Sequence, residues 1–292
     1  MLVVHDQALV IGWTGTDLRL NYAYSFDTLG RYWSPAITLP DHSFYRPTLS
    51  TIDGDFTISW TDLADNRYRT WSITNQTYES NPDEMNFDAP SEAVDDGFPP
   101  ASYLGIARTD MPTEIVYVFS SEFGDSEIAV GQSLWAPSLA ADEIPDNNHF
   151  YVAWLGVDGY LHYDVLWGSA APNQGATSQD GPAWATPNGQ QNVAWAATEH
   201  QLQVLDQANG IRPLGGPINV TSPNAPSLAA DRDLYFAWMD RNAQIQTREV
   251  NERAVRNTDE SNHNSPSRAI DVGGTRRTAW TSAEDGFSAI SW

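Results

Sequence analysis

One short pattern recurs along this chain of 292 residues and constrains its fold more than any other feature. The pattern is an apolar run that ends in tryptophan and is followed by a polar turn, as in "VIGWTGTDLRL" and "YVAWLGVDGYL". Six clear copies are centred on Trp13, Trp60, Trp154, Trp195, Trp238 and Trp280, and a weaker seventh, "IVYVFSSE", is centred on Phe119. The spacings of 47, 59, 35, 41, 43 and 42 residues indicate one supersecondary unit of about forty residues, repeated seven times.

Two further residue types recur at similar positions relative to this tryptophan, which we call the anchor of each unit. A proline followed by a short apolar run lies upstream, at Pro47, Pro100, Pro137, Pro182, Pro226 and Pro266. An acidic residue or asparagine lies four residues downstream at Asp17, Asp158, Glu199, Asn242 and Glu284, and five residues downstream at Asp65. The intervening segments are short, rich in β-branched and aromatic residues and bounded by turn formers, which is typical of strands.

These marks predict an all-β chain, a seven-bladed β-propeller of three- to four-stranded antiparallel blades. We expect a single domain, 1–292, with repeats at about 1–45, 46–98, 99–134, 135–180, 181–224, 225–264 and 265–292. Each tryptophan should present a large apolar side chain to the neighbouring blade, and each acid or asparagine should form a tight turn. The acidic stretch 75–100 reads as a long exposed loop. The last repeat ends without a fourth strand, as in a three-stranded blade or a chain cut from something longer.

Composition excludes several classes of function. The chain has no cysteine, so disulfides, thiol nucleophiles and thiolate metal sites are ruled out. Its 38 acidic and 15 basic residues, all of the latter arginine, give a net charge of −23, which disfavours nucleic acid as a partner. No apolar stretch is long enough to span a membrane, and "MLVVHDQALV" does not resemble a signal peptide. The protein therefore stays inside the cell, or its signal was removed or never cloned.

No cofactor is expected from the sequence. The six histidines show no paired spacing for a metal site. The acid-rich segments "IDGD" and "DEIPDNN" fit either weak Ca²⁺ binding or ordinary solvated turns.

Candidate binding residues lie in two sets of connections that emerge on one face of such a propeller. Between blades, two residues before each proline, stand Tyr45 (followed by Arg46), Phe98, Trp135, Asp180, Asn224 and Asn264. Asp17 and Asp158 lie in the turns after the tryptophan. Aromatic rings stack on the C–H faces of sugars while carboxylates accept their hydroxyl protons, so Tyr45, Arg46, Phe98, Trp135, Asp17 and Asp158 predict binding of neutral glycans. The same residue types are also ordinary turn formers.

The segment "GWTGTDLRLNYAYSFDTLGRYWSPAITLP" resembles the Asp-box repeats of sialidase-like bacterial propellers, which read W-T-G-T-D-x-x-L-N and then S-x-D-G-x-x-W. The match is close over this first unit, and the other six units keep its Pro, Trp and turn positions. The Asp-box analogue is Ser25, Asp27, Gly30 and Trp33, with one extra residue before the glycine. The resemblance implies that this box is a folding device away from the ligand face. It also implies an extracellular location.

The resemblance further suggests a catalytic candidate. Family sialidases clamp the substrate carboxylate with three arginines and use a Tyr–Glu nucleophile pair with an Asp acid/base. Their first arginine lies in a [FY]-R-[IL]-P motif, to which Tyr45-Arg46-Pro47 corresponds without the aliphatic residue. The other arginines considered share no register: Arg67, Arg69, Arg108, Arg212 and Arg268.

Three functions remain open from the sequence. They are a lectin-like glycan-binding protein, a sialidase-like exo-glycosidase, and a non-catalytic protein-interaction module of a larger polypeptide.

Overall fold

The computed structural model describes the backbone of residues 2–5, 8–27, 32–52, 54–78, 85–86, 88–95, 103–121, 127–141, 150–166, 175–186, 190–206, 210–213, 220–230, 234–249, 256–261, 267–270, 276–281 and 287–291. Side chains are described for these residues except 2–5, 8, 52, 95, 206, 210, 212–213 and all those from 256 onward.

The described strands form seven small antiparallel sheets, each made of strands that follow one another in sequence. The first sheet contains β1 (Leu2–His5), β2 (Ala8–Thr14), β3 (Arg19–Tyr24) and β4 (Ile37–His42). The second contains β5 (Thr48–Ile52), β6 (Asp55–Thr61), β7 (Tyr68–Ser72) and β8 (Thr77–Tyr78). The third contains β9 (Ser91–Asp95), β10 (Tyr103–Thr109), β11 (Ile115–Ser120) and β12 (Glu127–Gln132).

The remaining four sheets follow the same plan. The fourth contains β13 (Ser138–Ala141), β14 (Phe150–Leu155) and β15 (Leu161–Val165). The fifth contains β16 (Ala183–Ala185), β17 (Asn192–Ala196), β18 (Leu202–Asp206) and β19 (Gly210–Pro213). The sixth contains β20 (Ser227–Ala230), β21 (Leu234–Met239), β22 (Gln244–Glu249) and β23 (Arg256–Ser261). The seventh contains β24 (Ser267–Ile270), β25 (Arg276–Thr281) and β26 (Phe287–Ser291), so the expected three-stranded last sheet is present.

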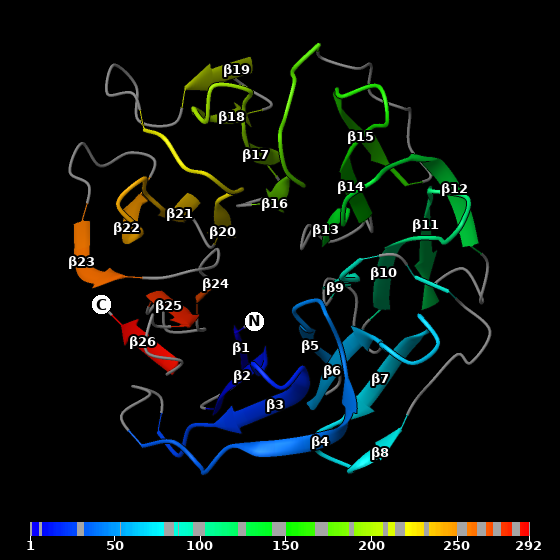
Figure 1. The fold of residues 1–292 in the computed structure, drawn as a ribbon, viewed down its shortest axis with the longest axis vertical. Coiled ribbons are helices and arrows are strands. Elements are labelled where there is room, and N and C mark those ends of the chain that lie inside the picture. The colour runs from blue at the N-terminus through cyan, green and yellow to red at the C-terminus, as the bar shows by residue number, and fades with distance from the viewer. Residues whose placement is uncertain are drawn as a thin grey trace.

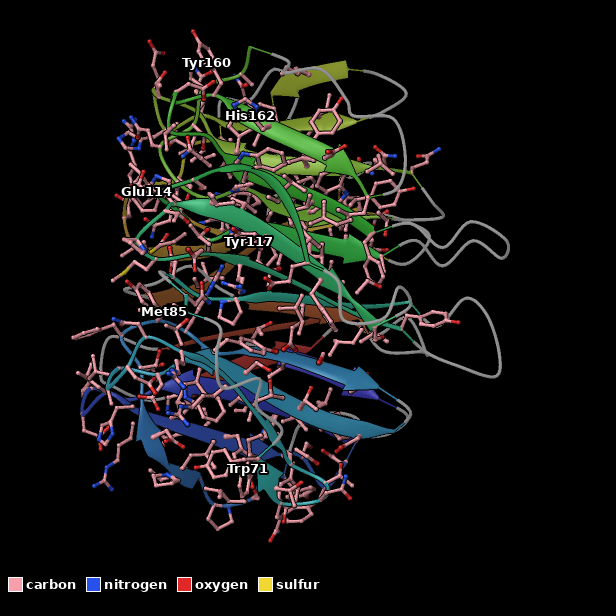
Figure 2. The ribbon with its side chains drawn as sticks, turned by 90° about the vertical axis from the view of Figure 1, so that its right-hand side faces the viewer. Trp71, Met85, Glu114, Tyr117, Tyr160 and His162 are labelled. Carbon is pink, nitrogen blue, oxygen red and sulfur yellow. The ribbon has the colours of Figure 1, made fainter. Side chains whose placement is uncertain are left out.

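The sheets lie around a common centre, with the first strand of each sheet innermost (Figure 1). First strands of successive sheets contact each other from β1 through β5, β9, β13, β16 and β20 to β24, and β24 also contacts β1. Seen from the side, Met85, Glu114 and Tyr160 lie toward one end of the molecule (Figure 2). The fold is therefore all-β and propeller-like. Among the described residues, no helix is long and apolar enough to span a membrane.

Four of the recurring tryptophans, Trp60, Trp154, Trp195 and Trp238, pack between neighbouring sheets, as expected. Trp13 is only partly buried, against residues of its own sheet, and the side chain of Trp280 lies outside the described part of the chain. In β14 every residue is buried, because alternate side chains face the sheets on either side. Phe150 and Trp154 pack against β10 and β11 of the third sheet, whereas Tyr151 packs against the fifth. Trp60 likewise packs on Val10, Leu20 and Tyr22, and Trp238 on Leu202 and Val204.

The predicted anchor of the third unit is wrong. Phe119 lies in β11, the third strand of its sheet, and the position equivalent to the tryptophans is Arg108 in β10. Arg108 pairs with Tyr117 across β10 and β11, just as Trp60 pairs with Arg69 across β6 and β7. It lies 48 residues after Trp60 and 46 before Trp154, which restores even spacing. The apolar pattern was misleading here because this one unit uses a cation at the anchor.

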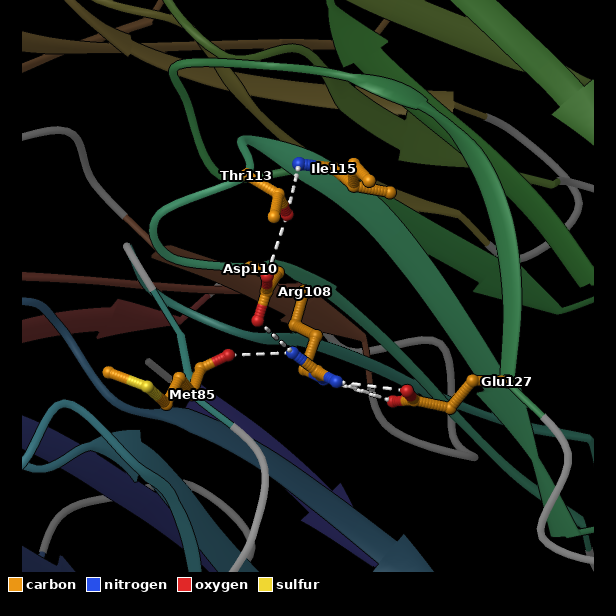
Figure 3. Close-up of polar contacts among 6 residues, drawn as sticks. All are labelled: Met85, Arg108, Asp110, Thr113, Ile115 and Glu127. Atoms are coloured by element: carbon orange, nitrogen blue, oxygen red, sulfur yellow. Dashed lines mark hydrogen bonds and ion pairs between the residues drawn. The ribbon is translucent and has the colours of Figure 1, made fainter.

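Arg108 is buried and held on several sides (Figure 3). Its guanidinium donates to both Glu127 oxygens at 2.8 and 2.9 Å and to the Met85 carbonyl oxygen at 2.6 Å. Asp110 lies 3.5 Å from Nη1, and the guanidinium carbon lies 5.1 Å from the centre of the Tyr117 ring. The side chain therefore ties β12 and the segment before β9 to the centre of the third sheet.

The predicted first strand of the third unit is also displaced. β9 follows Pro90, not Pro100, and pairs with β10 from Ser91 to Asp95. The sequence "APSEAV" is thus the counterpart of "APSLAA" in two other units. The boundary at 98/99 and the long loop 75–100 are corrected accordingly, since part of that stretch is a strand at the centre of the molecule.

The interface between the second and third sheets is polar. Glu92 in β9 stands where the related units carry leucine, and it is buried. Tyr68 donates its hydroxyl proton to Glu92 Oε1 and Ser50 donates to Oε2, each at 2.7 Å. Thr70 donates to the Tyr68 hydroxyl oxygen at 2.9 Å. Hydroxyl groups and one carboxyl therefore fill the place that aromatic and aliphatic groups fill elsewhere.

This interface predicts a pH-dependent stability. Burial raises the pKa of the Glu92 carboxyl above its usual 4.5, although the hydrogen bonds from Ser50, Ser59 and Tyr68 oppose that rise. Above the unfolded pKa the folded state therefore binds more protons, and its stability falls as pH rises through the folded pKa. Glu92→Gln cannot ionise, so the variant should gain stability relative to the wild type as pH rises. Urea unfolding from about pH 4 to about pH 8 measures this difference.

The matched control is Glu199→Gln, because Glu199 is exposed in a turn. The pH dependence of Glu92→Gln should exceed that of this variant, because only the Glu92 side chain is buried between sheets. An equal pH dependence of the two variants would contradict an ionisable group at the interface.

Candidate functional site

The two sets of connections lie on one face, as predicted. In four sheets a backbone hydrogen bond of 2.7–2.9 Å joins the turn between the second and third strands to the following connection between sheets: Ser43 N to Leu18 O, Asn86 N to Asn66 O, Ser133 N to Glu114 O, and Ser222 N to His200 O. We call the surface made by these turns and connections the turn face. Met85, Glu114 and Tyr160 mark it in Figure 2.

The connections between sheets share one local geometry. A buried serine four residues before the proline accepts the N–H of the residue two positions further on. This bond joins Tyr45 to Ser43 (3.1 Å), Trp135 to Ser133 (3.0 Å), Asp180 to Ser178 (3.3 Å) and Asn224 to Ser222 (3.2 Å). Such side chain to backbone bonds fix tight turns, so each connection presents one defined residue next to an inner strand.

Asp88 is the residue that sequence reasoning missed. Because β9 follows Pro90, Asp88 and not Phe98 is the counterpart of Tyr45 and Trp135. Phe98 itself lies outside the described residues. The signal was present in "DAPSEAV", whose A-P-S matches the start of two other units, but the buried Glu92 broke the apolar run used to find strands.

Trp135 is exposed on a rigid support. Its indole is 40% exposed, and Leu134 beside it is also exposed. Its N–H donates to Ser133 Oγ, its carbonyl accepts the Thr109 hydroxyl at 3.1 Å, and the next N–H, of Ala136, donates to Asp88 Oδ2 at 3.0 Å. Three hydrogen bonds therefore fix the backbone that carries the partly exposed ring.

Asp88 connects Trp135 to a charged group of residues. Burial raises the pKa of the Asp88 carboxyl, whereas the N–H groups of Ala89 and Ala136 and the positive charge of Arg46 act in the opposite direction. Asp180 adds to the rise, and Asp88 in turn contributes, after burial, to a raised pKa of Tyr45. These electrostatic couplings require proximity. We call Tyr45, Arg46, Asp88, Trp135 and Asp180 the axial cluster.

The carboxylates of Asp88 and Asp180 also hydrogen-bond to the next connection between sheets. Asp180 Oδ2 accepts the N–H of Ala225 in the next connection at 3.0 Å, the same contact that Asp88 makes to Ala136.

Asp17 and Asp158 stabilise the turns in which they lie. Asp17 Oδ1 accepts the N–H of Arg19 at 3.1 Å, and Asp158 Oδ1 accepts that of Tyr160 at 3.0 Å. A hydrogen bond from His162 is the main cause that lowers the pKa of Asp158. Within the described residues no contact joins either acid to the axial cluster. Tyr45 and Arg46 are linked to the loop of Trp135 through Asp88, by charge on one side and by the Ala136 hydrogen bond on the other.

Three other arginines considered as substrate ligands are engaged by acids. Arg67 lies 3.8 Å from Asp65. Arg69 pairs with Asp62 at 2.9 Å and with Asp65 at 2.8 Å, and Arg108 pairs with Glu127. A Tyr–Glu pair does exist in Tyr68 and Glu92, but both side chains are buried between sheets. The side chains of Arg212 and Arg268 lie outside the described residues.

The Asp-box residues stabilise a hairpin in the first sheet. The Ser25 hydroxyl donates to the Asp27 carbonyl at 2.6 Å, and Ser25 pairs with Trp33 across the hairpin. Gly30 lies outside the described residues. In the part of the chain with described side chains, no three His, Asp or Glu residues lie together as a metal site, and Asp53 and the "DEIPDNN" segment fall outside that part.

Comparisons with known proteins bear on the fold alone. No family model and no curated protein matches the chain. A chain of a solved structure described as the crystal structure of the mitotic checkpoint complex superposes with a TM-score of 0.59 at 8% identity. The match covers 97% of this chain and 83% of the other, and it supports a β-rich, propeller-like fold.

Proposed function

We propose that this chain is a closed seven-bladed β-propeller that binds neutral glycans at the axial cluster on its turn face. The closure is supported by the contact between β1 and β24, which continues the series of inner-strand contacts around the centre. The sialidase-like resemblance of the first unit belongs to the same proposal.

The binding proposal depends on one observation, the exposed indole of Trp135 beside a buried carboxylate. An aromatic face stacks on the C–H face of a sugar ring, and the rigid backbone lowers the entropy lost on binding. Tyr45 and Arg46 add a hydroxyl and hydrogen-bond donors that can reach sugar hydroxyls. The ligand class is neutral because the chain carries a net charge of −23 and Arg46 is already coupled to Asp88.

We expect Trp135→Ala and Tyr45→Ala each to abolish glycan binding while the protein stays folded. Losing one stacking aromatic from a small site removes about 0.5–1.5 kcal/mol beyond its buried area, which is enough to eliminate a weak signal. Binding of the labelled protein to an array of neutral glycans measures the effect, and thermal melting reports the folding of each variant.

Phe44→Ala is the matched control, because Phe44 precedes Tyr45 and its ring is 65% exposed. It should leave both readouts unchanged. Unaltered array binding by both axial variants would contradict the site, and turnover of a fluorogenic sialoside would shift the function to a glycosidase with Arg46 as the first residue to test.

A protein-interaction platform is the second candidate. Exposed apolar side chains on the turn face favour it, namely those of Phe44, Met85, Leu134 and Val157. Absence of any glycan signal from the wild type would support this role over the first.

A further inference from the structure

A second hollow lies away from the axial cluster, between the fourth and fifth sheets. A cavity of about 370 Å³ is lined by Gly175–Thr177, Ala197–Glu199, Gln201, Gln203 and Ile211. Thr177 is bridged to Tyr160, at the edge of the fourth sheet, whereas Gln203 lies in β18 of the fifth. Its size falls within the range of about 300–1,000 Å³ typical of small-molecule sites.

The key residue of this cavity is Gln203, which pairs with Trp195 across β17 and β18. The corresponding residue in the other sheets with described side chains already has a partner. Asn21 donates to the Arg19 carbonyl, Arg69 pairs with Asp62, Tyr117 lies under Arg108, His162 bonds Asp158, and Gln246 donates to Asp240.

Gln203 differs because the turn of its sheet begins with Ala197, where the sixth sheet has Asp240. Leu202 and Val204 point into the core with the sixth sheet, so the alternation of the strand directs Gln201 and Gln203 to the opposite side, toward the fourth sheet. Among the described residues, no hydrogen bond engages the side chains of Gln201, Gln203 or Thr177. The residues equivalent to Gln203 in the other sheets with described side chains have side-chain partners, whereas the Gln203 amide faces the cavity.

We propose that this inter-sheet cavity binds one neutral, polyhydroxylated ring, such as a single hexose unit. The amides of Gln201 and Gln203 and the hydroxyls of Thr177 and Thr198 each donate and accept, which matches neighbouring sugar hydroxyls. Glu199 accepts, and Ile211 offers an apolar surface to a C–H face. Among the lining residues that the structure describes, none is an arginine or histidine and Glu199 is acidic, so this part of the lining disfavours an anionic ligand.

The ligand class rests on the proposed function, whereas the position of the site does not. A glycan that reached both the cavity and the axial cluster would bind more tightly through avidity. The two sites use different residues and can be removed separately.

Saturation-transfer NMR with free glucose, galactose, mannose and N-acetylglucosamine tests the cavity directly. The wild type should give a signal with at least one of these sugars, and Gln203→Leu should lose it or bind about tenfold more weakly, as expected when a site loses a hydrogen-bonding group. Gln246→Leu is the matched control, since it makes the same change at the equivalent position where Asp240 already holds the amide. These variants are compared in the Tyr45→Ala background, where the axial cluster no longer contributes, so the signal that is measured there reports the cavity alone.

Every outcome decides the proposal. No signal from any neutral sugar, an equal signal from Gln203→Leu, or a stronger signal from N-acetylneuraminic acid would overturn it. Loss of all signals in Tyr45→Ala would overturn the cavity but leave the axial site standing. Should Gln203→Leu fail to fold, Thr177→Val removes a different hydrogen-bonding group of the same cavity and is read in the same way.

Discussion

Trp238→Ala should lower the free energy of unfolding by about 3–5 kcal/mol, the usual cost of deleting a large buried aromatic side chain. Trp238 is 2% exposed and packs on Leu202 and Val204 of the fifth sheet as well as on Phe236 of its own strand. Its removal therefore opens a cavity between two sheets that have no covalent link apart from one connection. Urea unfolding measures the loss as a lower midpoint.

Trp135→Ala is the control for this experiment because the residue type and the substitution are the same. Trp135 is 40% exposed, against 2% for Trp238, so its removal should cost clearly less stability than the removal of Trp238. An equal loss in the two variants would mean that burial between sheets is not what makes the recurring tryptophan necessary.

Arg108→Leu should be the other strongly destabilising substitution, by about 3 kcal/mol. The guanidinium is buried, and its removal leaves the Glu127 carboxylate and the Met85 carbonyl without their donor. Breaking a buried ion pair from one side costs about 3–5 kcal/mol. The lower value is expected because the Glu127 side chain is 27% exposed, so water can solvate its charge in part.

A double-mutant cycle separates the ion pair from the packing. Arg108→Leu with Glu127→Leu removes the carboxylate that accepts the two short hydrogen bonds from Arg108, so the double variant should be more stable than Arg108→Leu alone. Additive losses in the cycle would contradict the pairing, and a wild-type midpoint for Arg108→Leu would show that the third sheet does not depend on this residue.

The repeat could be read from the sequence wherever packing is apolar. Trp60, Trp154, Trp195 and Trp238 follow apolar strand residues, and their burial between sheets was predicted from spacing alone. The third unit could not be read in that way, because Arg108 and Glu92 occupy positions that elsewhere carry tryptophan and leucine. A charged residue at a buried position gives no hydrophobic signal, and only its partners make it tolerable there.

The candidate site was predicted in part. Tyr45, Arg46 and Trp135 came from their register with proline, and their use as one binding site stays a prediction. Asp17 and Asp158 came from an equally regular register, but regularity there reflects a turn that needs an acceptor for the N–H two residues later. Sequence spacing cannot tell a repeated structural bond from a repeated ligand contact.

The sequence by itself determined the strand-and-turn unit, its repetition and the face on which the connections lie, because each follows from local periodicity and turn chemistry. Only the tertiary structure decided which residues meet. Asp88 reaches the loop of Trp135, Glu92 meets Tyr68, and Gln203 faces a cavity because successive sheets are packed side by side around one centre. These contacts form between residues of different sheets, so they are set only when the sheets pack together.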